Sequence, residues 1–124
     1  MSNPLLLKNF TAGAAINAYR ICKFSAAETV TLAAAATDSL IGVNNDVAPV
    51  LGERCDVVML GIAFVEAGAA IALGAMVTSD AVGRAVTAAP AAGVNNRVIG
   101  LALEAASASG DIIRVLLEPG VIQG

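Results

Sequence analysis

The side chains best suited to acid–base chemistry in this sequence are carboxylates, because its 124 residues include no histidine. Without an imidazole, Ser-His-Asp and Cys-His sites and most metal sites are excluded. A carboxylate pair stays conceivable, and Asp56, Glu66, Asp80 and Glu104 each stand beside a turn-prone segment. The ordinary interpretation of such residues is a solvated loop carboxylate. We therefore expect no catalytic residues and no enzyme, with a carboxylate-only enzyme as the alternative in that class.

Cys22 and Cys55 also have reactive side chains. Two cysteines are too few for the disulfide framework of a secreted domain, and these two lack CxxC spacing. Zinc would need carboxylates as its remaining ligands. Each cysteine lies in an apolar, strand-like run, which is typical of a small buried hydrophobic residue. The glycine-rich positions are not followed by the helix that a phosphate loop needs. We expect no bound metal and no cofactor.

Charge is sparse along the whole chain. Charged residues make up 14% of the sequence, against about 25% in ordinary soluble domains, while hydrophobic residues make up 57% and aromatic residues 3%. The net charge is −3 and the basic residues are scattered, so nucleic acid is not expected as a partner. So few charges leave apolar surface that partner chains would cover. We expect self-association, with an alanine-rich monomer as the alternative.

The apolar run from Val57 to Val77 is long enough to span a bilayer. Glu66 lies near its centre, where a carboxylate is costly, and no aromatic belt flanks it. The run therefore predicts two strands separated by a turn at residues 66–68, and no membrane partner. The opening MSNPLLLKNF lacks the features of a signal peptide, which predicts a cytoplasmic protein.

Short runs of β-branched and apolar residues recur roughly every 8–12 residues, with turn chemistry between them. The expected strands are 19–24, 29–32, 40–43, 55–60, 62–65, 70–73, 75–78, 84–87, 98–103 and 112–118. Turns are expected at residues 25–28, 44–46, 79–83 and 95–96, and Pro119-Gly120 is expected to end the last strand. This spacing predicts an all-β fold, a small antiparallel β-barrel or sandwich.

Two pairs of short segments within the chain resemble one another, and this weak internal similarity favours a domain with two lobes. Leu40-Ile41-Gly42-Val43 resembles Val98-Ile99-Gly100-Leu101, and residues 42–45 resemble residues 93–96. Such short matches are common in a sequence of low complexity, so they indicate an ancestral repeat only weakly.

The N-terminal segment has apolar side chains but no predicted element of its own to bury them. These side chains are Pro4, Leu5, Leu6, Leu7 and Phe10. We expect an extended N-terminal arm that docks through these residues on its own domain, on a sister subunit or on another protein, and we predict that the residues are buried only in an assembly. The predicted division is an arm at 1–16, a β-barrel or sandwich domain at 17–119 and a C-terminal tail at 120–124.

The stretch from Tyr19 to Pro119 resembles the capsid cement, or head decoration, proteins of tailed phages. The matching segments are 19–21, 23–24, 37–43, 61–63, 67–74, 77–80, 83–86, 99–103, 108, 110–111 and 115–117. The resemblance implies a homotrimeric β-barrel-like protein seated on the outer surface of the virion capsid. It also implies binding to the major capsid protein and stabilisation of contacts between its subunits, with an arm that reaches across neighbours. The alternative is a cytoplasmic β-barrel or β-clip module that binds a small ligand.

Overall fold

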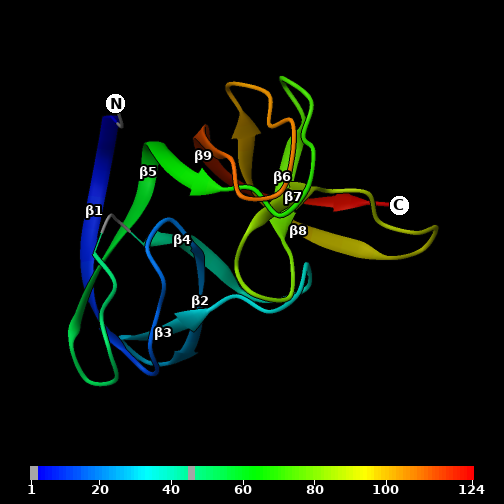
Figure 1. Cartoon of the computed structure of the whole chain (residues 1–124). Coiled ribbons are helices and arrows are strands. Elements are labelled where there is room, and N and C mark those ends of the chain that lie inside the picture. Colours follow the sequence, from blue (N-terminus) through cyan, green and yellow to red (C-terminus); the bar gives the residue numbers. More distant parts are fainter. Residues whose placement is uncertain (1–2, 45–46) are drawn as a thin grey trace.

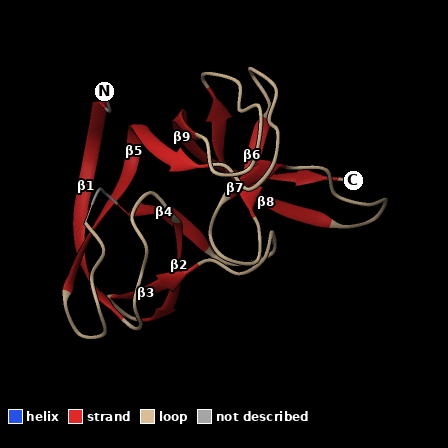
Figure 2. Cartoon of the chain, in the orientation of Figure 1, coloured by secondary structure: helices blue, strands red, loops and turns tan. Residues whose placement is uncertain are grey.

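Nine β-strands joined by turns and loops make up the computed structural model, which describes residues 3–44 and 47–124 (Figures 1 and 2). No helix occurs in these residues. The strands are β1 (Asn3–Ala12), β2 (Ile21–Ala26), β3 (Thr29–Leu32), β4 (Leu40–Asn44), β5 (Arg54–Glu66), β6 (Met76–Ser79), β7 (Ala85–Thr87), β8 (Asn95–Ala102) and β9 (Ile112–Gln123).

The strands form one sheet in the order β1-β3-β2-β4-β5-β9-β8-β6-β7, and part of it closes on itself. An added antiparallel pairing of β1 with β5 closes the first five strands into a barrel. The contact of β1 with β3 is parallel and short, with Thr11 opposite Thr29 and Ala12 opposite Val30. β1 is therefore held mainly by β5.

β5 is the longest strand, at 13 residues, and it belongs to both parts of the sheet. Its first half pairs with β1 and β4, and its second half pairs with β9 (Figure 1). Gly61 lies between the halves with a φ of 100°, in the left-handed region that favours glycine. The two strands expected at residues 55–60 and 62–65 are therefore one continuous strand, which bends at Gly61.

Two clusters of buried side chains lie on opposite faces of the barrel wall. The smaller cluster, here called the barrel core, draws on all five barrel strands: Phe10, Ala12, Ile16, Cys22, Val30, Ile41, Cys55 and Val57. The larger cluster joins the outer face of β4 and β5 to β6, β8 and β9. Every residue of β4 is buried because Ile41 faces the barrel core while Leu40 and Val43 face the larger cluster.

Gly42 and Gly100 let neighbouring strands approach one another closely. A Cβ atom on Gly42 would collide with the carbonyl oxygen of Val58, and one on Gly100 would collide with that of Leu116. The two glycines occupy the same place in the similar segments that begin at Leu40 and Val98. The glycine at the shared position of the two similar segments therefore has the same role in both, which is to let the backbone of a neighbouring strand come close.

The all-β fold with a small barrel is confirmed, and the pairings between its strands are antiparallel except that of β1 with β3. β2, β3, β4, β6, β7 and the first half of β9 form within a few residues of the expected ranges, and the hairpin turn at residues 79–83 is present. Residues 70–73 do not form a strand, since Ile71 makes only an isolated bridge with Ala106. The turn expected at residues 44–46 falls largely on residues 45–46, outside the described ones.

An extended N-terminal arm is not evident. Residues 3–12 are β1, whose backbone pairs with β5 from Asn3 opposite Ile62 to Thr11 opposite Arg54. Phe10 is 5% exposed in the single chain, so the expectation that it is buried only in an assembly is wrong. Local pattern could not show this, because the partner strand lies about fifty residues further along the chain. The proposed boundaries at residues 16/17 and 119/120 stay a prediction.

Pro119 and Gly120 do not end the last strand. Pro119 has no N–H to give to the ladder, and the pairing of β8 with β9 shifts register there, between Val98 and Gly100. The ladder then resumes, so that Asn95 and Asn96 pair with Gln123 and Ile122 instead of forming the expected turn. A second strand can thus carry β9 past a proline that a local pattern reads as a stop.

Phe10→Ala should destabilise the fold far more than Leu5→Ala. Phe10 fills the barrel core and its ring meets that of Phe24 edge to face, with centroids 5.8 Å apart, whereas Leu5 is 84% exposed. We expect a loss of about 3 kcal/mol in the free energy of unfolding for Phe10→Ala and less than about 0.5 kcal/mol for Leu5→Ala. Urea unfolding followed by circular dichroism measures both. Equal, small effects would mean that β1 is not part of the barrel.

Gly42→Ala and Gly100→Ala should each destabilise the protein, because the new methyl group meets a backbone carbonyl that cannot move without breaking the ladder. We expect about 1–3 kcal/mol for each. Gly120→Ala is the matched control, since nothing lies within 4 Å of a Cβ there and its φ is not positive. Thermal unfolding of the three variants tests this, and a Gly120→Ala variant as unstable as the other two would contradict the close-approach argument.

Candidate functional site

The four carboxylates that could have done acid–base chemistry lie apart and each contacts an arginine. The salt bridges are Arg54–Asp56 at 3.2 Å, Arg20–Glu66 at 3.4 Å, Arg84–Asp80 at 2.9 Å and Arg114–Glu104 at 3.4 Å. The Arg54–Asp56 contact is an ion pair without hydrogen-bond geometry, because Asp56 Oδ1 has no hydrogen-bond partner among the described residues. No two of the four carboxylates share a salt bridge in this structure.

Arg20 and Glu66 form the most buried of these ion pairs, with side chains 15% and 24% exposed. Arg20 also donates from Nη1 to the carbonyl oxygen of Val82 at 3.0 Å. The neighbouring residue, Tyr19, has a φ of 62° and accepts a hydrogen bond from the Glu66 N–H at 2.9 Å. Glu66 therefore ties the end of β5 to the segment before β2, and Arg20 extends the link to the β6–β7 turn, which is a structural role.

Two aspartates in loops are held ionised by local hydrogen bonds. Burial opposes ionisation of Asp38, but N–H groups of Ala34 and Ala35 and the Lys23 ammonium group outweigh it and lower its pKa. The N–H and the hydroxyl of Ser107 donate to Asp111 Oδ2 at 2.8 and 2.9 Å, which lowers the pKa of that carboxyl. A general acid needs a raised pKa, so neither aspartate suits that task.

Within residues 3–44 and 47–124, no group of three or more His, Cys, Asp or Glu side chains is arranged to hold a metal ion. In the same residues no helix has the length and apolar character needed to cross a bilayer.

The most distinctive exposed feature is an apolar surface on β1 and β5. Leu5, Leu6 and Leu7 of β1 are 84%, 45% and 40% exposed, and Leu60 of β5, opposite Leu6 in the ladder, is 44% exposed. We call these four residues the leucine surface. Three consecutive leucines are exposed because the ladder shifts register twice between Pro4 and Leu7, and because β1 reaches the barrel core only at Phe10.

The structure thus divides the residues expected to contact a partner. Leu5, Leu6 and Leu7 remain available on the surface, while Phe10 is packed inside the barrel. The backbone of Pro4 lies opposite Gly61, and its side chain is outside the described ones. Leu60 was not foreseen, and the uniformly apolar run around it gives no signal that one of its side chains faces outward.

A polar groove adjoins the leucine surface. It has a volume of about 370 Å³ and is lined in part by Lys8, Glu28 and Arg54. Lys8 pairs with Glu28 at 2.8 Å, and its Nζ lies 4.5 Å from the centre of the Phe10 ring. These contacts hold the Lys8 ammonium group between the Glu28 carboxylate and the Phe10 ring.

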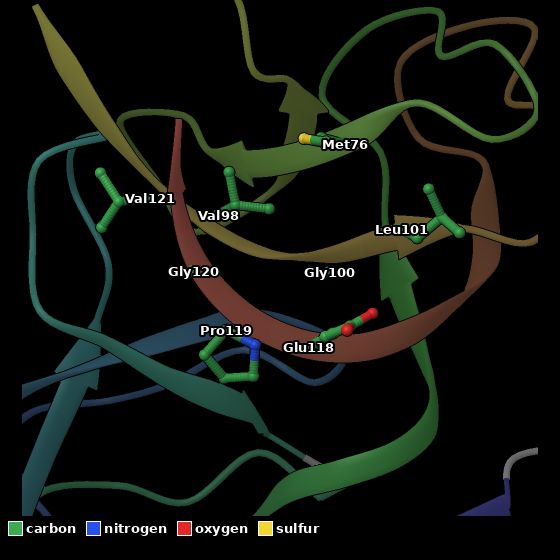
Figure 3. A pocket seen from close by; sticks show the side chains of 8 residues that line it. All are labelled: Met76, Val98, Gly100, Leu101, Glu118, Pro119, Gly120 and Val121. Carbon is green, nitrogen blue, oxygen red and sulfur yellow. The ribbon is translucent and has the colours of Figure 1, made fainter. Parts of the chain in front are cut away.

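An apolar groove of about 300 Å³ lies where β8 and β9 shift register. Met76, Leu101 and Val121 line it together with Pro119, and Glu118 is its one charged residue (Figure 3). It opens because Pro119 interrupts the ladder between the two strands. The sequence gives no sign of this groove, because Pro119-Gly120 has the pattern of a strand end.

A third group of exposed apolar side chains lies in the loop before β5. Val47, Val50 and Leu51 are all exposed there. The loop is tied to the rest of the chain by backbone bonds, among them Gly52 N–H to the Ala12 carbonyl at 2.8 Å. Its sequence, Pro49-Val50-Leu51-Gly52, has a proline and a glycine on either side of two apolar residues. This pattern is typical of a turn and could have predicted that Val50 and Leu51 are exposed.

The chain is similar to known phage proteins both in its sequence and in its fold. The phage cement protein family matches residues 6–117. No curated protein matches the chain. Among solved structures, the N-terminal base of the head fiber gp8.5 of bacteriophage phi29 is similar, with a TM-score of 0.69 and 21% identity over 91% of this chain and 93% of that one. That likeness shows the shared fold. With the family matched over nearly the whole barrel and sheet, the chain belongs to the phage cement proteins, a family of structural components of the phage head.

Proposed function

We propose that this protein binds the outer surface of a phage head and stabilises contacts between major capsid protein subunits, using the leucine surface as its main contact. The observation that carries the proposal is the exposure of Leu5, Leu6, Leu7 and Leu60 on a hydrogen-bonded strand pair. Membership in the phage cement proteins supports the location on the head and a role without catalysis.

The leucine surface is suited to binding because it is already ordered. Fully burying one leucine is worth about 1.5–3 kcal/mol. A flexible arm would lose about 1–2 kcal/mol per residue in backbone entropy on binding, which would cancel most of that gain. β1 is fixed by its ladder with β5, so this cost was met when the chain folded. Each copy then needs only a few contacts to remain bound.

The chain itself is proposed to be a homotrimer. Its sparse charge supports self-association, and the exposed apolar side chains outside the leucine surface, around the β8–β9 groove and on the loop before β5, offer surface for it. A closed ring is expected because an open head-to-tail contact would produce fibres. Linking copies in this way raises the retention of each copy on the head without new contacts.

One feature favours the alternative, a small-ligand binding module. The β8–β9 groove, at about 300 Å³, reaches the lower end of the range for small-molecule sites. Its lining includes no aromatic side chain, and Glu118 is its one charged group. Pockets that recognise ligands combine several convergent polar groups with aromatic walls. The groove is therefore better suited to contact with another protein.

The combined variant Leu5→Ser, Leu6→Ser, Leu7→Ser should lose binding to heads while staying folded. Its side chains lie outside both cores, so we expect its urea midpoint to stay close to that of the parent protein. Cosedimentation with heads that lack the protein measures binding, and we expect at least a roughly hundred-fold weaker affinity from the lost burial.

The matched control is Leu73→Ser, which changes a leucine that is 70% exposed on the loop between β5 and β6. It should bind heads as the parent protein does. If the triple variant also binds at parental strength, the leucine surface is not the contact, and another face of the protein holds the capsid.

Light scattering coupled to size-exclusion chromatography should give a mass three times that of the protomer at micromolar concentration. The physical reason is the exposed apolar surface that 14% charged residues leave uncovered. A sharply monomeric peak at that concentration would contradict the trimer, and a mass that grows without limit would contradict closure.

A further inference from the structure

Beyond the last contacts of β9 with β5, the sheet continues as a ribbon of two strands. The ladder of β5 with β9 ends at Leu117, and β6 pairs with β8 at Gly100 and Leu101. Among the described residues, the start of β8 therefore has only the end of β9 as a ladder partner. We call residues 95–98 and 120–123 the ribbon. It lies on the opposite side of the molecule from β1 (Figure 1).

The two faces of the ribbon differ in exposure. The inner face lies against the rest of the chain, because Val98 is buried and the Arg97 N–H donates to the carbonyl oxygen of Ala36 at 2.6 Å. Residues directly opposite one another in an antiparallel pair have their side chains on the same face. Two such pairs are exposed on all their members and make up the outer face: Arg97 with Val121, and Asn95 with Gln123.

The β8–β9 groove continues from this outer face. Val121 belongs to both, since it lies opposite Arg97 in the ladder and lines the groove (Figure 3). Val121 is 64% exposed, and Met76, which also lines the groove, is 50% exposed. Glu118 lines the groove three residues before Val121. We call the outer face and the groove together the ribbon surface, which has an apolar centre and one charge of each sign.

Neither charge of the ribbon surface is neutralised within the chain. Within residues 3–44 and 47–124, Arg97 and Glu118 form no salt bridge. Every other basic residue forms one: Lys8, Arg20, Lys23, Arg54, Arg84 and Arg114. A surface that presents one unpaired charge of each sign beside exposed apolar side chains is complementary to a second copy of itself.

We propose, building on the homotrimer of the proposed function, that the ribbon surface is the contact between copies of this chain. Arg97 of one copy pairs with Glu118 of the next, and Val121 is buried between them. The two charges occupy different places on the surface, so the contact runs head to tail and closes into a ring. The leucine surface, on β1, stays uncovered and available to the capsid (Figure 1).

The apolar centre and the two charges have separate effects on this contact. Burial of Val121 and Met76 supplies affinity, because both are largely exposed in the single chain. The charges select the orientation, since a contact turned so that Arg97 meets Arg97 brings like charges together. A partner without this arrangement of charges leaves Arg97 or Glu118 unpaired beside an apolar contact.

Charge reversal tests the pairing directly. In Arg97→Glu and in Glu118→Arg, like charges meet at every contact of the ring, so the dissociation constant of the oligomer should rise roughly ten- to hundred-fold. The double variant, Arg97→Glu with Glu118→Arg, restores opposite charges and should associate like the parent protein. Sedimentation velocity over a series of concentrations measures all four proteins, and circular dichroism checks that each is folded.

Val121→Ser tests the apolar centre, and Val47→Ser is its matched control. Val47 is 65% exposed, close to the 64% of Val121, and lies in the loop before β5. Val121→Ser should raise the dissociation constant roughly ten-fold through lost burial, and Val47→Ser should leave it unchanged. If Val47→Ser separates the copies and Val121→Ser does not, the loop joins them and the proposal is wrong.

The remaining outcomes separate this contact from the proposed function. An oligomeric parent whose two single charge variants associate equally well, or whose double variant fails to recover, overturns the Arg97–Glu118 contact alone. Charge variants that stay oligomeric but no longer cosediment with heads would assign the ribbon surface to the capsid and also overturn it. A monomeric parent refutes the homotrimer and this contact together, while cosedimentation with heads still tests the leucine surface independently.

Discussion

The backbone pairing of β5 is the constraint on which the rest of the structure depends. One half of this strand has β1 and β4 as neighbours, and the other half has β9. The barrel and the outer sheet are therefore not two domains joined by a linker, since they share a strand. The bend at Gly61 lets the two halves follow different sheets without breaking the strand. The Arg20–Glu66 pair then secures the end of β5 against the start of β2.

Small side chains make this arrangement possible with little aromatic surface. β4 is buried on both faces, and Gly42 lets it approach the backbone of β5 as Gly100 lets β8 approach that of β9. Stability then comes from many weak contacts between close strands, which is the packing that an alanine- and valine-rich composition can supply. The fold is therefore sensitive to substitution at Gly42 and Gly100, because neither position has room for a methyl group.

Sequence reasoning succeeded where structure is local and failed where strands pair over long distances. Alternation and turn residues were sufficient for β2, β3, β4 and the β6–β7 hairpin. They could not show that residues 3–12 pair with β5, because the partner is about fifty positions away and the segment carries no alternation. The same limit hid the exposure of Leu60 and the continuation of β9 beyond Pro119. In each case one backbone pairing, invisible to a local pattern, decides where a side chain lies.

The closure of β1 onto β5 changes how the N-terminal leucines can work. In a flexible arm, the ordering of each residue would consume much of the energy gained by burying its side chain. On a paired strand, the same leucines form a surface of fixed shape. Pro4, the charge of Lys8 and the two register shifts also discourage the edge of β1 from adding a foreign strand, which is how natural sheets protect their edges. In the function proposed above, the leucines act through side-chain packing, and the partner offers them a complementary apolar hollow. The same two register shifts thus underlie both the exposure of three consecutive leucines and the protection of this strand edge.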